Sequence, residues 1–87
     1  YVVIRCQTAS NETIIGFHKN GENQATVSST ATETQNVDID TPRKSFTVNF
    51  TSDAKFDVGD ILGISVNPTD RPDNFTVTCV WEFDFVS

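Results

Sequence analysis

The sequence predicts an all-β fold, a small antiparallel β-sandwich of the jelly-roll type that forms one domain over residues 1–87. Three observations support this prediction. Apolar and polar residues alternate with a period of two in several segments, which is typical of strands with one buried and one solvated face. Turn-forming pairs such as Asn20-Gly21 and Gly59-Asp60 separate these segments. No segment has the residue spacing of an amphipathic helix.

The clearest alternation lies at the C-terminal end of the sequence. Over residues 75–85 every odd position is apolar, namely Phe75, Val77, Cys79, Trp81, Phe83 and Phe85. A strand of this length spans roughly 35 Å at about 3.3 Å per residue, which is more than a small sandwich needs to cover its own core. We therefore expect other copies of the chain to bury part of this apolar face.

The first part of the sequence predicts two further strands and a hairpin. Residues 1–8 place Val2, Ile4 and Cys6 on one face. Residues 13–19 are rich in β-branched and aromatic side chains, and the Asn-Gly pair that follows accepts the positive φ angles of a tight turn. We expect the chain to return along residues 24–29 and to pair with residues 13–19.

The rest of the sequence predicts an alternation of strands and turns. Residues 28–35 are almost wholly small and polar, which predicts a loop or an edge strand. Further on, Phe46, Val48 and Phe50 share one face, which we expect to point inward. The remaining segments predict strands at 35–40, 44–51 and 61–66, a tight turn at 56–60 and a long loop at 67–74. The whole chain then contains about seven or eight short strands.

Composition and charge exclude several classes of partner. The chain has 87 residues with 6 basic and 12 acidic side chains, a net charge of −6, which disfavours nucleic acid and anionic membrane surfaces. No apolar run approaches the ~20 residues of a membrane span. Because the sequence starts at Tyr1 inside a predicted strand and contains no methionine, we expect it to be the C-terminal fragment of a longer chain. A core of this size buries only about 60–65% of the unfolded surface, so oligomerisation is the expected supplement.

Residues with catalytic or metal-binding chemistry are few. The single histidine, His18, lies in the register opposite to the apolar face of its predicted strand, so we expect its side chain to face solvent. Aspartates gather in the predicted turn and loop, where turn formation is preferred over a calcium site because their spacing matches no fixed calcium loop. These are Asp53, Asp57, Asp60, Asp70 and Asp73. The sequence predicts no enzyme, no metal site and no cofactor.

Cys6 and Cys79 lie on the apolar side of the first and last predicted strands. A cross-strand disulfide and two buried thiols are both consistent with this placement, since cysteine is among the most buried residue types. Assembly in a reducing cytoplasm favours the thiols.

Three motifs of the C-terminal region follow one another in the sequence: a Gly-Asp turn at 59–60, an Asn-Pro-Thr loop at 67–69 and a Val-Thr-Cys-Val-Trp segment at 77–81. This arrangement resembles the C-terminal β-domains of fibres and appendages of tailed phages, particularly those of marine cyanobacterial phages. The resemblance covers residues 56–85 and extends loosely to residues 14–27. Gly-Asp turns before apolar strands also occur in trimeric sandwiches of the C1q and tumour-necrosis-factor kind.

The resemblance implies a homotrimeric tip domain of a virion appendage, assembled in the host cytoplasm, that binds a host-surface glycan or protein and contacts other virion proteins. A capsid-decorating or neck protein of the virion is one alternative, and a carbohydrate-binding accessory domain of a secreted enzyme is another. Because rigid sandwiches present recognition groups on loops, we assign receptor binding to Asn20, Asn67, Asp70, Arg71, Asp73 and Asn74. We assign the subunit interface to Tyr1, Val3, Trp81, Phe83 and Phe85.

Overall fold

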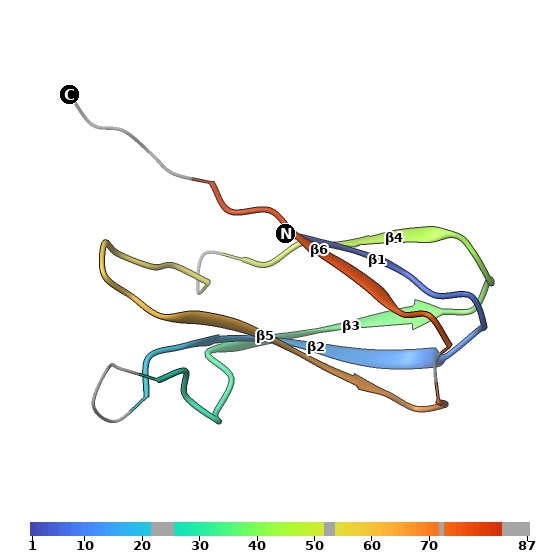
Figure 1. Cartoon of the computed structure of the whole chain (residues 1–87), viewed down its shortest axis with the longest axis horizontal. Coiled ribbons are helices and arrows are strands. Elements are labelled where there is room, and N and C mark those ends of the chain that lie inside the picture. The colour runs from blue at the N-terminus through green and yellow to red at the C-terminus, as the bar shows by residue number, and fades with distance from the viewer. Residues whose placement is uncertain (22–25, 52–53, 72, 83–87) are drawn as a thin grey trace.

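The computed structural model describes residues 1–21, 26–51, 54–71 and 73–82. Over these ranges the chain forms two three-stranded antiparallel sheets and no helix, and the sheets lie one above the other in Figure 1. The strand orders are β4-β1-β6 and β3-β2-β5. The strands are β1 (Val2–Arg5), β2 (Asn11–Lys19), β3 (Glu33–Ile39), β4 (Ser45–Val48), β5 (Leu62–Pro68) and β6 (Thr76–Cys79). The all-β prediction is confirmed, and the arrangement is compatible with a small β-sandwich.

The core lies between the two sheets. Ile4 of β1 and Ile15 of β2 are fully buried at its centre, and Ile39 and Val48 close it along β3 and β4. Along β5 and β6 it is closed by side chains that are only partly buried, such as Ile64. The predicted inward registers are confirmed for Val2, Ile4 and Cys6 and for Phe46, Val48 and Phe50.

The last strand is shorter than predicted. β6 pairs with β1 over Thr76–Cys79, and one further pair of backbone bonds joins Tyr1 and Val80, at 2.8 and 3.2 Å. Trp81 lies beyond this ladder and is not part of a strand. The prediction of a continuous strand over residues 75–85 is therefore wrong in its described part, because the chain leaves the sheet at Trp81, whose indole packs against other aromatic rings.

The two cysteines are free thiols, and the disulfide alternative is contradicted. Cys79 pairs with Val2, whereas Cys6 follows the other end of β1. Cys6 is buried as predicted, and its thiol donates a hydrogen bond to the Asp73 carbonyl at 3.3 Å. Cys79 lies on the apolar side as predicted, opposite the buried Val2, but it is exposed because it is the last residue of β6.

The partner of β2 also differs from the prediction. β2 pairs with β3, from Asn11 opposite Ile39 to Phe17 opposite Glu33. The described part of the predicted return strand, residues 26–29, forms no strand. Asn20 does adopt the positive φ angle expected of the turn, 46°. The part of the predicted turn at residues 22–23 lies outside the described residues, and the chain returns to the sheet later than predicted, at Glu33.

Residues 26–32, here called the crossing segment, lie across the outer face of the β3-β2-β5 sheet and run beneath it in Figure 1. Thr32 donates its backbone N–H to the Phe17 carbonyl at 2.8 Å. A Cβ atom at Gly63 would lie 2.9 Å from Val27 Cγ1, and one at Gly16 would lie 3.4 Å from Ala31 Cβ. The absence of side chains at these two glycines therefore lets the segment lie close to the strands.

His18 is buried beneath the crossing segment, with 9% of its surface exposed. Its Nδ1 atom lies 2.9 Å from the Ser28 carbonyl oxygen, and its Nε2 atom lies 2.7 Å from Ser65 Oγ. The prediction that His18 faces solvent is wrong because the crossing segment, which is not part of the strand pattern of β2, covers the outer face of the sheet. Alternation within β2 assigned the correct face but could not reveal this cover.

Candidate functional site

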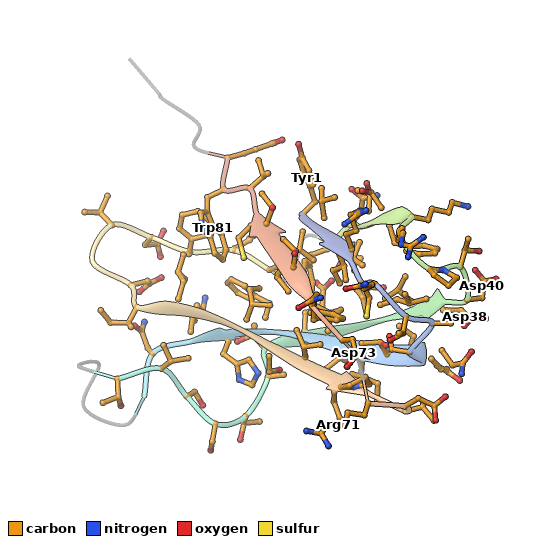
Figure 2. The ribbon with its side chains drawn as sticks, turned by 45° about the vertical axis from the view of Figure 1, so that its right-hand side comes forward. Tyr1, Asp38, Asp40, Arg71, Asp73 and Trp81 are labelled. Atoms are coloured by element: carbon orange, nitrogen blue, oxygen red, sulfur yellow. The ribbon has the colours of Figure 1, made fainter. Side chains whose placement is uncertain are left out.

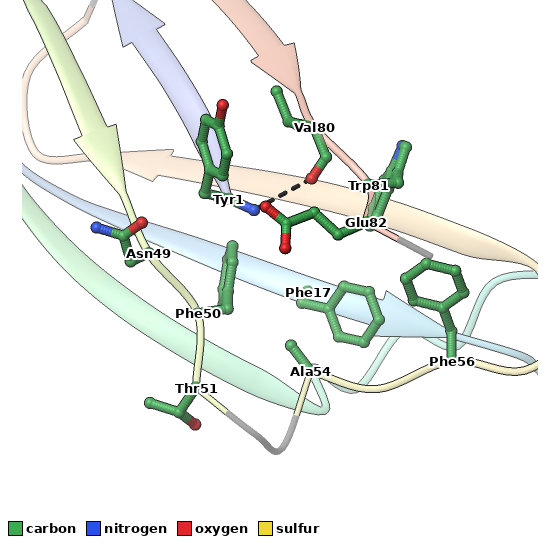
Figure 3. A pocket seen from close by; sticks show the side chains of 10 residues that line it. All are labelled: Tyr1, Phe17, Asn49, Phe50, Thr51, Ala54, Phe56, Val80, Trp81 and Glu82. Carbon is green, nitrogen blue, oxygen red and sulfur yellow. Dashed lines mark hydrogen bonds between the residues drawn. The ribbon is translucent and has the colours of Figure 1, made fainter. Parts of the chain in front are cut away.

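An open pocket of about 260 Å³ lies at the end of the sandwich where β1 begins and the chain leaves β6 (Figure 3). Ligand sites for drug-sized molecules typically measure about 300–1,000 Å³, so this pocket suits a single sugar ring or a small head group. Its polar lining side chains are Asn49, Thr51 and Glu82. Its aromatic lining side chains are Tyr1, Phe17, Phe50, Phe56 and Trp81.

The aromatic rings form a connected cluster. Phe17 is 1% exposed and its ring centre lies 6.2 Å from that of Phe50 and 6.1 Å from that of Trp81. Phe56 meets Trp81 edge to face, with ring centres 5.7 Å apart and planes at 86°. These tilted geometries are those that aromatic pairs prefer. Trp81 is 37% exposed, so the cluster has a buried floor and an accessible indole wall.

Separate elements bring these rings together. Phe17 comes from β2 and points into the space between the sheets, and Phe50 follows two residues after the end of β4. The backbone bonds between Tyr1 and Val80 fix the start of β1 beside the segment that carries Trp81 (Figure 3). The pocket therefore forms only when both sheets are assembled.

A tight turn precedes β5 and places Phe56 beside Trp81. Asp60 N–H bonds to the Asp57 carbonyl at 3.1 Å, and the Asp60 carboxylate accepts the Asp57 N–H at 2.7 Å. Gly59 has a φ of 92°, a conformation that glycine adopts without strain. The predicted turn at 56–60 is confirmed.

The turn is tied to the end of β2 by Asn20. Its amide donates to the Asp60 carboxylate at 2.6 Å, and its side-chain oxygen accepts the Ile61 N–H at 2.8 Å. The backbone N–H of Asp57 lowers the pKa of Asp60 below its usual value, and the Asn20 amide and the Lys19 charge lower it further against a small opposing effect of burial. The ionised carboxylate is thus the form that holds the turn.

A second carboxylate, that of Glu33, holds Thr51 in place at the edge of the pocket. Glu33 of β3 accepts hydrogen bonds from the backbone N–H and the hydroxyl of Thr51, at 2.8 and 2.6 Å, and from the Gln35 amide at 2.9 Å. Burial alone raises the pKa of Glu33, but these hydrogen bonds outweigh it and the net pKa is lowered. The contact links the edge of one sheet to the chain that follows β4 in the other.

The residues assigned to receptor binding do not form one site. Asn20 directly follows β2 at the end that is near the pocket, whereas the other five lie toward the opposite end, from Asn67, which pairs with Ile14 of β2, to Asn74. Asn67 belongs to β5 and is exposed, and Arg71 points away from the sheets in Figure 2.

Several polar groups of that distant segment bond to the protein itself. Asp70 accepts a hydrogen bond from the Asn11 amide, and the Asn74 amide donates to the side chain of Gln7. The backbone of Asp73 accepts the Gln7 N–H at 3.0 Å. These contacts hold the segment against the start of the molecule and leave fewer polar groups to meet a ligand.

The residues assigned to the subunit interface divide differently. Tyr1 and Trp81 line the pocket, with 43% and 37% of their surfaces exposed. Val3 of β1 is partly buried. Phe83 and Phe85 lie outside the described residues. Trp81 therefore has partners within its own chain and still presents accessible surface.

The His18–Ser65 pair has the contact of a serine with a base. Since a carbonyl oxygen only accepts, Nδ1 donates its proton to Ser28, and Nε2 and the Ser65 hydroxyl share the second hydrogen bond. Both residues sit inside regular strands, paired with Gly63 and Gly16. We interpret the pair as structural: it holds the crossing segment through the bond from His18 to Ser28. An oxyanion site would need free backbone N–H groups, and the hydrogen bonds between β2 and β5 already use those of the surrounding strands.

In the described ranges, no three histidine, cysteine, aspartate or glutamate side chains converge as a metal site requires. Asp60 serves the turn, as turn chemistry predicts, and Asp53 lies outside these ranges. No helix of the described chain is long and apolar enough to cross a membrane.

The pocket therefore offers the most developed binding chemistry in the described molecule, with stacking faces and a few polar groups. Sequence reasoning missed Phe17, Phe50 and Phe56 as site residues because each fits a strand or turn pattern typical of core packing. A scan of protein-family models, a search of curated proteins and a search of solved structures each find no match for this chain.

Proposed function

We propose that this domain is a receptor-binding module at the tip of a virion appendage and that the aromatic pocket binds a host-surface glycan. The pocket is the observation that carries the proposal. Aromatic faces pack against the apolar face of a sugar ring, while a few polar groups hydrogen-bond its hydroxyls. Trp81 supplies an accessible face, and Asn49 supplies an amide at the rim.

The appendage context rests on the sequence resemblance of residues 56–85. In this proposal the domain is a homotrimer with a jelly-roll-like topology, and sister copies meet at the outer face of β1 around Val3, which leaves the pocket faces of Tyr1 and Trp81 open to a ligand. The position of Val3 supports such a contact, since its apolar side chain lies on the face of β1 opposite to the buried Val2 and Ile4. Association would add stability to a small core.

A carbohydrate-binding accessory domain of a secreted enzyme is a second candidate, and the same pocket favours it. The two candidates differ in oligomeric state and context. Sedimentation of the purified domain separates them, because a stable trimer supports the appendage tip and a monomer that binds sugars supports the accessory domain.

Sugar binding can be measured through the single tryptophan of the sequence. A panel of neutral mono- and disaccharides should change the Trp81 fluorescence, and Phe50→Leu should weaken the response by about tenfold, since a desolvated aromatic contact contributes about 1 kcal/mol or more. Phe46→Leu is the matched control: Phe46 is partly buried in β4 but does not line the pocket. Equal weakening by both variants, or no response to any sugar, would overturn the pocket assignment.

Attachment is tested separately by competition. An excess of free domain should block adsorption of the phage to its host, and the Phe50→Leu variant should block it less. Saturating protein that never competes would contradict the appendage-tip proposal and leave the virion-decorating alternative.

A further inference from the structure

The pocket combines aromatic faces with negative charge. Of its lining side chains only Glu82 is charged at neutral pH, and none is basic; the amino group of Tyr1 at the mouth donates its hydrogen bond to the Val80 carbonyl. Figure 3 shows the Glu82 side chain reaching across the mouth from the Trp81 side toward Tyr1. The whole chain adds to this field with its net charge of −6. An anionic ligand is therefore repelled both by the rim and by the molecule.

The Glu82 carboxylate has no hydrogen bond or ion pair within the part of the chain that the structure describes. It differs in this respect from Glu33 and Asp60, whose carboxylates accept hydrogen bonds that hold the fold. A carboxylate beside apolar rings gains most from a ligand that brings its own positive charge.

The rings provide the second half of a cation site. The electron-rich faces of tryptophan, tyrosine and phenylalanine attract an ammonium group within about 6 Å of the ring centre, and clusters of such rings bind quaternary ammonium ligands. The Trp81 ring centre lies 6.1 Å from that of Phe17 and 5.7 Å from that of Phe56, and Tyr1 lies across the mouth. A small cation can therefore approach several rings at once.

We propose that the aromatic pocket binds its ligand through an ammonium group, held against the rings around Trp81 and paired with the Glu82 carboxylate. The inference rests on the proposed function, in which this pocket is the ligand site, and it names the ligand class: a protonated amino sugar or a choline-like head group. These two sources share the same positively charged nitrogen. The experiment compares both kinds of ligand with uncharged analogues and so distinguishes an amino sugar from a choline-like head group.

Choline and 3,3-dimethyl-1-butanol form a matched pair of probes, because they have nearly the same shape and only choline is charged. Choline should change the Trp81 fluorescence at concentrations about tenfold lower than its neutral analogue. Protonated glucosamine compared with glucose gives the second arm. Preference for glucosamine alone identifies an amino sugar, and preference for choline alone identifies a quaternary head group.

Glu82→Gln tests the pairing directly. It keeps the shape of the side chain and should remove most of the preference for the charged probes, and raising the salt concentration should weaken their binding to the unaltered protein. Glu12→Gln is the control: it makes the same charge change at an exposed residue next to the far end of the sandwich. Thermal unfolding of both variants checks that the fold is intact.

Equal binding of charged and neutral probes would overturn the ammonium inference while leaving the glycan-binding pocket in place. Preference for the cations that persists unchanged in Glu82→Gln would overturn the role of the carboxylate. If no sugar and no cation binds, both the inference and the proposed function fail.

Discussion

The two ends of the sandwich use their side chains in different ways. At the end near Asn11, polar groups of the 67–74 segment bond to neighbouring parts of the same chain, such as Asp70 to Asn11. At the other end, five aromatic side chains surround a pocket, and the Glu82 carboxylate at its mouth has no partner in the described residues. A polar loop is therefore not by itself a recognition surface, because its polarity can serve the fold.

The aromatic end contributes both to the stability of the fold and to the pocket. Among the variants considered, Phe17→Ala should have the largest effect on both. Phe17 is 1% exposed and touches both Phe50 and Trp81. Removing its ring should destabilise the domain by about 3–5 kcal/mol, through lost burial and the cavity left behind. Urea unfolding measures the change. Phe46→Ala, at a partly buried position outside the pocket, should be clearly milder, and the comparison fails if it is not.

Trp81→Leu should separate binding from stability. Because Trp81 is 37% exposed, its loss should lower the free energy of unfolding by less than the loss of Phe17, about 1–2 kcal/mol. Ligand binding, measured by calorimetry, should weaken at least tenfold. Phe75→Leu, near the opposite end, should leave binding unchanged. A Trp81→Leu variant that binds normally would exclude the indole from the site.

At the polar end, Asp70→Ala should cost about 1 kcal/mol or less, the usual contribution of one exposed hydrogen bond. Ligand binding at the pocket should not change. Asn11→Ala removes the other partner of the same bond, so the double variant should be no less stable than the worse single one. Loss of receptor attachment in Asp70→Ala with intact pocket binding would restore the loop as the recognition surface.

The smallest expected effect is a pH dependence at the turn beside Phe56. The folded-state pKa of Asp60 is lowered, so its carboxylate contributes stability above the usual unfolded pKa of about 3.9, and the contribution is lost as pH falls through the lower folded value. The unfolding midpoint of Asp60→Asn should therefore lie below that of the unaltered protein at pH 6, and the gap should narrow toward pH 3. A gap that stays constant with pH would assign the effect to packing.

The sequence predicted the features that depend on local patterns. Alternation correctly assigned Val2 and Ile4 to the core, and the residues around Gly59 correctly predicted the tight turn. Alternation reports which face a residue takes but not which strand lies beside it. For that reason residues 24–29, and not β3, were predicted beside β2, and the last strand was extended past Cys79.

The pocket was beyond the reach of such reasoning. Phe17, Phe50 and Trp81 are far apart in the sequence, and each fits a pattern that core residues also show. The pairing of β1 with both β4 and β6 brings the segments of Phe50 and Trp81 to one end of the molecule, and the packing of the two sheets adds Phe17 from β2. The burial of His18 has the same cause, since the cover comes from residues 26–32 and not from its own strand.

The two glycines beneath the crossing segment allow it to pack closely on the outer face of the sheet. A methyl group at Gly16 would meet Ser65 Oγ at 2.5 Å and His18 Nε2 at 2.9 Å, and one at Gly63 would meet Val27. At Gly63 the methyl group would push against the crossing segment itself, and at Gly16 it would displace the side chains of His18 and Ser65 beneath that segment. We expect an alanine at either position to make the crossing segment a site of rapid proteolytic cleavage, while the β4-β1-β6 sheet keeps its native amide-exchange rates.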